Sequence, residues 1–254
     1  MKKIILLLII PFLFTSCIGG KKNQNLMSLG LNKDIERITV TNNKYAGKYT
    51  IIDKKTIERF SNTILEAKDA KSDSGLESDF TFEFYSESKS IASFKYIAGI
   101  DDESTANLYD DKGRLYHVDN SIEDEFINRL MKKGNFKHVS EYYESLLSLI
   151  FEKTNIQKGQ IAVVDIRKDF LVTKYITSIE QKKMIESIDN KGITVKFPKE
   201  AEKYDYYILI DTRKYNDNTC KTYVTVTDSL GSKVIYVLEG NYIDSKWSYY
   251  IKFK

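Results

Sequence analysis

Histidine is the side chain whose charge changes near neutral pH, so the two histidines of the chain are the first candidates for proton transfer or metal binding. His117 lies beside Tyr116 in a strand-like segment, and His138 precedes a helical one. The H-E-x-x-H, C-x-x-C and G-x-S-x-G motifs are absent from the sequence. We therefore expect both histidines to be structural or solvated, and we predict no catalytic residue, no cofactor and no metal site.

Two other patterns have the residue types of a reactive or metal-binding site but not the spacing. Ser86 and Lys89 match S-x-x-K, a motif that in penicillin-binding enzymes places a nucleophilic serine and its lysine on one helical face. Here the motif falls in a turn between strand-like segments, and neither S-D-N nor K-T-G follows. The acidic runs 101–103 and 110–111 lack the spacing and the closing glutamate of a calcium loop. We interpret the first pattern as chance and the second as solvated loop charges.

Tyrosine is the enriched residue type, with 18 in a chain of 254 residues. Adjacent tyrosines in a strand point to opposite faces of the sheet, so one of each pair should reach solvent or a partner. Tyrosine is favoured at interfaces because its ring buries apolar area while its hydroxyl keeps a hydrogen bond. We take Tyr206, Tyr207, Tyr249 and Tyr250 as a candidate partner-binding face. The alternative is that the β-propensity of tyrosine on a half-buried sheet explains these pairs.

The first residues of the chain have the three-part layout of a signal peptide. Two lysines precede an apolar run over residues 4–14, too short for a permanent membrane helix, and small residues follow. The residues LFTSC at 13–17 resemble the lipobox of bacterial lipoproteins, although Phe14 stands where Leu, Val or Ile is usual. The resemblance implies that the peptide is cleaved before Cys17 and that the Cys17 thiol is diacylated. The alternative is that Cys17 ends an ordinary signal peptide or an uncleaved anchor.

Lipidation would place the protein outside the cytoplasm, on the outer face of the cell membrane or on the outer membrane of a Gram-negative host. The membrane is then its first partner, and residues 19–25 are typical of a flexible, solvated tether. Removing the two lysines of the signal peptide lowers the formal net charge from +3 to +1, which gives no footprint for nucleic acid. With Cys17 acylated, Cys220 is the remaining thiol, so no internal disulfide can form.

The hydrophobic periodicity of the rest of the chain predicts an α+β fold. Short strands at 35–42 and 45–52 precede a helix that Asp53 caps and that runs to about residue 70. Alternating residues from Phe80 then begin an antiparallel meander, and another helix begins at Ser121. The clearest helix carries apolar residues at helical spacing over 139–151, and its wide apolar stripe places it between the two halves.

From residue 160 the same order of elements begins again. Strands are predicted at 161–166 and 170–175, a capping box of Ser178 and Gln181 opens a helix, and a second meander runs to residue 253. We infer two similar α+β units, each strand-strand-helix and then a meander, and a single mixed domain is the rival interpretation. The order resembles tandem units of small surface lipoproteins of low-GC bacteria in architecture alone. The predicted organisation is a signal peptide at 1–16, a lipidated cysteine and tether at 17–33, a first unit at 34–132, a connecting helix at 133–159 and a second unit at 160–254.

These patterns favour a non-enzymatic surface module, anchored to a membrane, that binds a ligand or a protein partner as an accessory sensor or in envelope assembly. Two alternatives from other classes remain open. One is a cell-envelope enzyme that uses an unrecognised carboxylate pair, and the other is a structural or adhesive surface protein. A deep pocket with converging carboxylates would favour the enzyme, and a shallow tyrosine-rich sheet face would favour binding. The absence of both features would favour the structural or adhesive protein.

Overall fold

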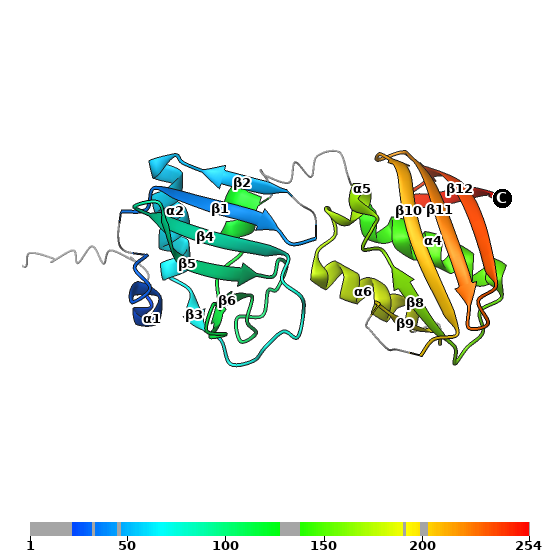
Figure 1. Ribbon diagram of the computed structural model, residues 1–254, viewed down its shortest axis with the longest axis horizontal. Helices are drawn as coiled ribbons and strands as arrows, with labels where there is room; N and C mark the ends of the chain where they lie inside the picture. Colours follow the sequence, from blue (N-terminus) through cyan, green and yellow to red (C-terminus); the bar gives the residue numbers. More distant parts are fainter. Residues whose placement is uncertain are drawn as a thin grey trace, which may run out of the picture.

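The computed structural model describes residues 22–31, 34–44, 47–127, 138–189, 192–198 and 203–253 of the chain. These residues form an α+β fold with two separate β-sheets, and helices lie against a face of each (Figure 1). Cys17, the other lipobox-like residues and residues 18–21 of the expected tether lie outside the described residues. The prediction of a flexible tether is wrong for residues 23–25, because Asn23 caps the helical turn Gln24–Met27 and its backbone N–H donates to the carbonyl of Leu65 at 2.7 Å. No helix of the described residues combines the length and the apolar character that a membrane crossing requires.

The first sheet is antiparallel throughout its strand pairings. Phe80, Phe82 and Phe84 alternate with more exposed residues along one strand, so that the three rings are buried on one face. The order across the sheet is β2–β1–β4–β5–β6–β7–β3. The strands are β1 (Arg37–Asn42), β2 (Lys48–Ile51), β3 (Lys68–Asp69), β4 (Phe80–Ser86), β5 (Lys89–Tyr96), β6 (Leu108–Asp110) and β7 (Leu115–His117).

Helix α2 (Lys54–Leu65) packs on the buried face of the first sheet. Asp53 caps it as predicted, because its carboxylate accepts a hydrogen bond from the backbone N–H of Thr56 at 2.9 Å. The ring of Phe60 lies 5.0 Å from that of Phe82, centroid to centroid, and the two rings are nearly perpendicular. The short α1 (Gln24–Met27) and the π-helical η1 (Glu123–Ile127) complete the same core.

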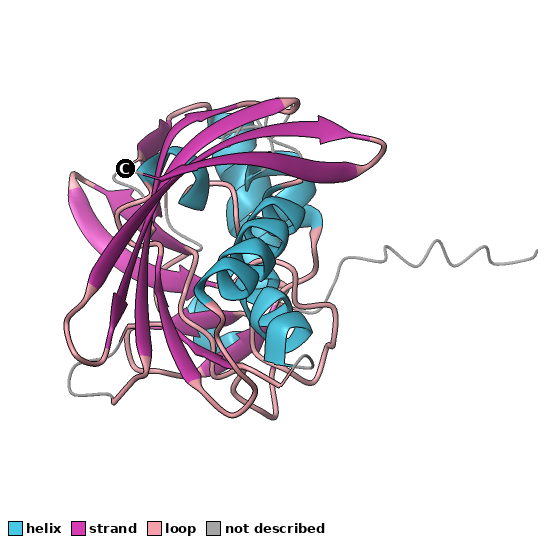
Figure 2. Ribbon diagram, turned by 90° about the vertical axis from the view of Figure 1, so that its right-hand side faces the viewer, coloured by secondary structure: helices cyan, strands magenta, loops and turns pink. Residues whose placement is uncertain are grey.

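The second sheet has the order β13–β12–β11–β10–β8–β9. Strands β10 to β13 pair antiparallel with one another and form the predicted meander. Strand β8 runs parallel to both of its neighbours, β10 and β9. The sheet curves around the helices that cover one face, called here the inner face (Figure 2). The strands are β8 (Ile161–Asp165), β9 (Thr194–Lys196), β10 (Tyr206–Tyr215), β11 (Thr219–Asp228), β12 (Lys233–Ile243) and β13 (Lys246–Phe253).

Helix α4 (Val139–Thr154) is the long helix of the sequence analysis, and its seven predicted apolar residues are all buried. They belong to the core of the second sheet, where they also meet α6 (Ser178–Asp189). The prediction that this helix lies between the two halves is therefore wrong. Its apolar stripe is wide because it packs against β13 on one side and α6 on another. The residues 133–137 of the predicted connecting helix lie outside the described residues.

The predicted strand at 170–175 is also wrong, because Phe170–Thr173 form the single helical turn α5. Its apolar and β-branched residues are typical of a strand, but the backbone N–H of Thr173 bonds to the carbonyl of Asp169 at 3.0 Å. The carboxylate of Asp169 is held in turn by the backbone N–H of Thr212 on β10. This long-range contact stabilises the turn. It could not be predicted from the local pattern of apolar residues.

The capping box of α6 is formed one residue earlier than predicted. The backbone N–H of Thr177 donates to the Glu180 carboxylate at 2.7 Å, and the backbone N–H of Glu180 donates to the Thr177 hydroxyl at 3.3 Å. Ser178 has a different partner, because its backbone N–H and hydroxyl both donate to Asp79.

The two sheets have separate hydrophobic cores. One core gathers residues from Leu26 to Ile127, and the other gathers residues from Val139 to Trp247. The second sheet contains parallel pairs and is preceded by α4, whereas the strands of the first sheet are paired only antiparallel. The two halves therefore differ in strand pairing, contrary to the expectation of two similar units.

Candidate functional site

The four tyrosines of the predicted binding face lie on both faces of the second sheet. Tyr206 and Tyr249 pack against the core under the inner face, and the Tyr249 hydroxyl donates to the carbonyl of Tyr142 at 3.0 Å. Tyr207 and Tyr250 alternate with them and belong to the opposite, outer face, where Tyr250 is 65% exposed.

Tyr207 and Tyr250 are also far apart on the outer face. Tyr207 is level with Thr227 on β11 and so with Lys233 on β12, whereas Tyr250 is level with Glu239 on β12. Six residues separate 233 from 239, which is about 20 Å along a strand. The structure does not bring the four tyrosines together, so they form no single aromatic face.

Tyr207 belongs instead to a polar cluster at the carboxyl end of β8. Its hydroxyl donates to the Asp165 carboxylate, which also accepts from Nε and Nη2 of Arg167 at 3.0 and 2.9 Å. Burial acts to raise the pKa of Asp165, but the hydrogen bonds from Arg167 and Tyr207 outweigh it and lower the pKa to about 2. Asp165 is thus an ionised carboxylate that orients Arg167, whose own side chain stays 66% exposed.

The other reactive residue types of the sequence have structural surroundings. His117 Nδ1 lies 2.9 Å from the carbonyl of Thr105, and His138 stacks on the ring of Tyr242. Ser86 and Lys89 pair across the β4–β5 hairpin and not along a helix, as the sequence predicted. Within the described ranges, no group of three or more His, Cys, Asp or Glu side chains is placed to hold a metal ion.

A cavity of about 630 Å³ is lined by residues of both halves of the molecule, which meet near the centre of Figure 1. We call it the junction cavity. The first half contributes the turn after β1 and the loop 75–77, and the second half contributes one side of α6 and the segments that follow β8 and β9. The residues that line it are Asn43, Lys44, Gly75, Leu76, Glu77, Ile166, Arg167, Thr173, Ser178, Gln181, Lys182, Ile185, Glu186, Phe197 and Pro198.

The position of the junction cavity follows from the parallel strands of the second sheet. β8 and β9 run in the same direction, so their carboxyl ends meet at one edge, and the next residues, Ile166 and Phe197, both line the cavity. Open α/β sheets bind their ligands at this edge, because the loops there carry side chains away from the packed core. The parallel pairing that the sequence did not predict therefore creates the candidate site.

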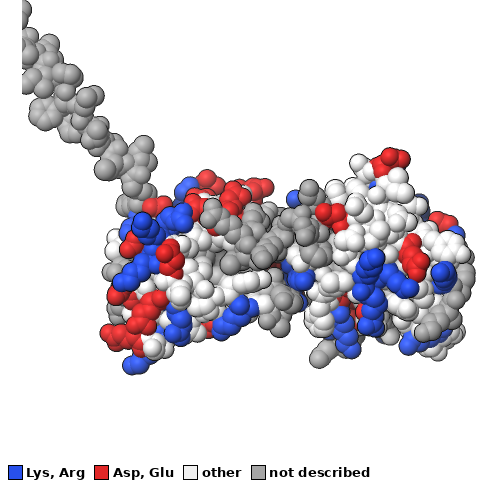
Figure 3. Space-filling model, turned by 90° about the horizontal axis from the view of Figure 1, so that it is seen from above, with Lys and Arg blue, Asp and Glu red and all other residues white. Residues whose placement is uncertain are grey.

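The lining combines an apolar part with charges of both signs. Leu76, Ile166, Ile185, Phe197 and Pro198 supply the apolar part. The charged residues are Lys44, Glu77, Arg167, Lys182 and Glu186. On the face of the molecule shown in Figure 3, Lys and Arg side chains lie among Asp and Glu side chains. The arrangement suits a small molecule with an apolar body and polar groups at its ends.

A buried ion pair of the first half bonds to residues of the second half beside this cavity. Lys44 Nζ lies 2.9 Å from Asp79 Oδ1, with side chains 14% and 4% exposed, and it also donates to the carbonyl of Ile176 at 3.1 Å. Desolvation by burial lowers the pKa of Lys44, and the nearby Asp79 opposes this. Asp79 in turn accepts two hydrogen bonds from Ser178, so a residue of the first half caps a helix of the second.

A close backbone approach accompanies this ion pair. Gly99 has a φ of +82°, and a Cβ atom there would lie 2.9 Å from Cγ2 of Ile179 on α6. A larger residue at 99 would therefore both strain the loop and push α6 away from the first half. The junction is a specific contact surface with a buried polar centre.

Asp169 is a buried carboxylate two residues after Arg167, but it does not line the cavity itself. Desolvation raises its pKa, while hydrogen bonds from Thr212 and Tyr143 act in the opposite direction. The side chain is 1% exposed, and its oxygens accept from the hydroxyls of Tyr143 and Thr212, both at 2.8 Å. These contacts give it a structural role in joining α4, α5 and β10.

Most residues of the junction cavity belong to no sequence motif, so the cavity was not predicted. One signal was available, since Pro198 is the only proline after the signal peptide and marks the end of a short strand beside Phe197. Lys44 and Asp79 gave no comparable signal, because they are far apart in the sequence and their bonds to Ile176 and Ser178 depend on how the two halves meet.

Comparison with known proteins gives one partial match. Residues 31–135 are similar to the family described as YhfM protein. The match covers less than half of the chain, includes the strands of the first sheet and η1, and stops before α4. No curated protein and no solved structure matches the chain.

Proposed function

We propose that this chain is a lipid-anchored extracytoplasmic protein that binds a small, partly apolar ligand in the junction cavity without transforming it. The observation that carries the proposal is the cavity itself. Its volume of about 630 Å³ is within the range of sites that enclose small molecules, roughly 300 to 1,000 Å³. Its lining has an apolar part and a few polar groups, which is the usual composition of such sites.

A ligand in this position would contact both halves of the molecule. Leu76 and Glu77 approach from the first half, and Ile185 and Phe197 from the second. Such a ligand stabilises the relative placement of the halves by its affinity for that placement. This property fits an accessory sensor, in which ligand binding is reported through a change in the population of conformations.

The proposal includes two folding units that divide between Ile127 and His138. Separate sheets, separate hydrophobic cores and the end of the family match at residue 135 support this division. The boundary differs from the expected one, since α4 then belongs entirely to the second unit.

The anchoring part of the proposal depends on Cys17. We expect Cys17→Ala to abolish incorporation of labelled fatty acid and to leave the protein unprocessed or shed. Unchanged membrane retention and unchanged electrophoretic mobility of this variant would contradict lipidation. This experiment is independent of the cavity, so either part of the proposal can fail alone.

The cavity part is tested by filling the space. Gln181 lines the cavity from α6, whereas Lys183 is exposed on the same helix and lies outside the lining. We expect Gln181→Trp to abolish the fluorescence enhancement of 8-anilinonaphthalene-1-sulfonate, an anionic probe with an apolar body, and Lys183→Trp to preserve it. Melting temperatures within a few degrees of the parent protein would show that both variants fold. Equal probe binding by both variants would overturn the proposed site.

A further inference from the structure

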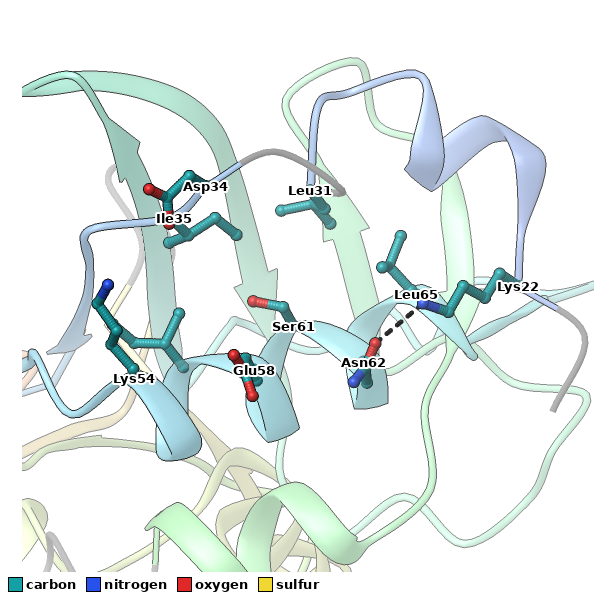
Figure 4. Close-up of a pocket in the computed structure, with 10 residues that line it drawn as sticks. Lys22, Leu31, Asp34, Ile35, Lys54, Glu58, Ser61, Asn62 and Leu65 are labelled. Atoms are coloured by element: carbon teal, nitrogen blue, oxygen red, sulfur yellow. Dashed lines mark hydrogen bonds between the residues drawn. The ribbon is translucent and has the colours of Figure 1, made fainter. Parts of the chain in front are cut away.

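A second, smaller pocket lies in the first half, between the N-terminal segment and α2 (Figure 4). Its volume is about 260 Å³. The backbone N–H of Asn23 donates to the carbonyl of Leu65 at 2.7 Å, and Lys22 Nζ donates to Asn62 Oδ1 at 3.0 Å. These bonds attach the start of the described chain to the end of α2, so the pocket has two fixed walls.

The interior of this pocket is apolar except for one hydroxyl. Leu31, Ile35, Ile57 and Leu65 line it, and each is at most 7% exposed. Ser61 lies among them, 6% exposed, and its Oγ has no hydrogen-bond partner. In Figure 4 this hydroxyl points across the pocket toward the segment that carries Ile35. A buried hydroxyl without a partner is unfavourable in the free protein, so a ligand that bonds to it gains affinity.

The rim of the pocket carries two positive and two negative side chains. They are Lys22, Lys54, Asp34 and Glu58, and no ion pair joins any of them to another residue in the part of the chain that the structure describes. Unpaired charges of both signs around an apolar floor are complementary to a zwitterion, whose anionic and cationic groups can meet partners on opposite sides.

The pocket is also close to the expected anchor. Lys22 is five residues after Cys17, and five extended residues span at most about 18 Å. If Cys17 is lipidated, as in the proposed function, the pocket lies near the headgroup layer of the membrane. We propose that this pocket binds a zwitterionic headgroup of the phosphoethanolamine type, with the phosphate toward Lys22, the ammonium toward Asp34 and Glu58 at the other end of the pocket, and a hydrogen bond to Ser61. The proposal that the ligand is a membrane lipid depends on the lipid anchor at Cys17. The proposal that the pocket binds a zwitterion does not depend on it.

The test uses the full chain with Cys17→Ser, so that no attached lipid competes, and soluble glycerophosphoethanolamine as the probe in an NMR titration. Ser61→Ala should weaken probe binding about tenfold, the effect of losing one hydrogen bond to a buried group. The melting temperature of this variant should not fall, because the unsatisfied hydroxyl is removed. The matched control is Thr63→Ala on the same helix, since the Thr63 hydroxyl bonds to the carbonyl of Arg59 and lies outside the pocket. No probe binding at millimolar concentration, or equal binding by both variants, would overturn the site.

A second arm identifies the source of the ligand. Vesicles of phosphatidylethanolamine should bind the chain and displace the probe, and vesicles of phosphatidylglycerol should do neither. Probe binding that depends on Ser61 but is not displaced by vesicles would support the zwitterion site and refute its membrane source. Gln181→Trp should leave probe binding unchanged, so a failure of the junction cavity as a ligand site remains distinguishable from a failure here.

Discussion

The carboxylate of Asp79 should contribute more to stability than its single ion pair suggests. Asp79→Ala leaves the buried ammonium of Lys44 without the partner at 2.9 Å, and it removes the acceptor of hydrogen bonds from Ser178 and from the backbone N–H of Ala98. Removing one side of a buried ion pair costs about 3 to 5 kcal/mol, because the remaining charge stays desolvated. We expect the free energy of unfolding to fall by about 4 kcal/mol.

Equilibrium unfolding in urea measures this change. Two further variants serve as an exposed-pair control and as a test of the coupling between Lys44 and Asp79. Glu103→Ala removes the partner of Lys68 in a pair whose side chains are 70% and 67% exposed, so it should leave the free energy of unfolding nearly unchanged. Lys44→Met removes the buried charge itself. The double variant Lys44→Met with Asp79→Ala should therefore lose at least about 1 kcal/mol less than the sum of the single losses.

The location of Asp79 predicts a second effect. Because Asp79 accepts two hydrogen bonds from Ser178 of the second half, Asp79→Ala should separate the unfolding of the two halves into two transitions, seen as a step in the urea curve. A loss below about 1 kcal/mol for Asp79→Ala, or additive losses in the double variant, would refute the reasoning that this pair is buried and coupled.

Three other outcomes follow from the second sheet. Tyr249→Ala should lower the free energy of unfolding by about 3 to 5 kcal/mol, because the Tyr249 ring packs on the core. Tyr250 is exposed, so Tyr250→Ala should change it by less than about 0.5 kcal/mol. Similar melting temperatures for the two variants would contradict this. The pKa of Asp165 is about 2 in the folded chain, against an ordinary value of 3.8. Its ionised form should therefore stabilise the fold by up to about 2 kcal/mol above about pH 4, and this contribution should be lost as the pH falls through 2. The free energy of unfolding of Asp165→Asn, measured against pH, should lack this dependence. Burial raises the pKa of the Cys220 thiol to about 12, so at about pH 8 a disulfide reagent should label it only in urea, and rapid labelling of the folded protein would show that the thiol is not buried.

Much of the secondary structure was predictable because local patterns determine it. The alternation at Phe80, Phe82 and Phe84 needs one buried face, and the Asp53 cap needs only the backbone N–H of Thr56. The helix over Val139–Thr154 was predicted for the same reason, since its apolar residues recur at helical spacing. In each case the residues that decide the structure are close together in the sequence.

The features that were not predictable depend on contacts between distant residues. The turn at Phe170 is fixed by a carboxylate that bonds to β10, and the sheet pairs β8 in parallel with a strand more than 40 residues away. The junction cavity depends on both, because parallel pairing brings the carboxyl ends of β8 and β9 to the first half. Tyrosine pairs suggested a binding face from strand alternation alone, but the register across β10 to β13 separates Tyr207 from Tyr250.

The central claim, that the junction cavity is a ligand site, is tested most directly by NMR of the chain labelled at isoleucine methyl groups and titrated with 8-anilinonaphthalene-1-sulfonate. Ile166 and Ile185 line the cavity, whereas Ile235 lies on the outer face of the second sheet and Ile243 near the end of β12. The account predicts saturable shifts of the first two methyl resonances, no shift of the other two, and loss of the shifts in Gln181→Trp. Shifts confined to Ile235 or Ile243, or no saturable shift at Ile166 and Ile185, would contradict it.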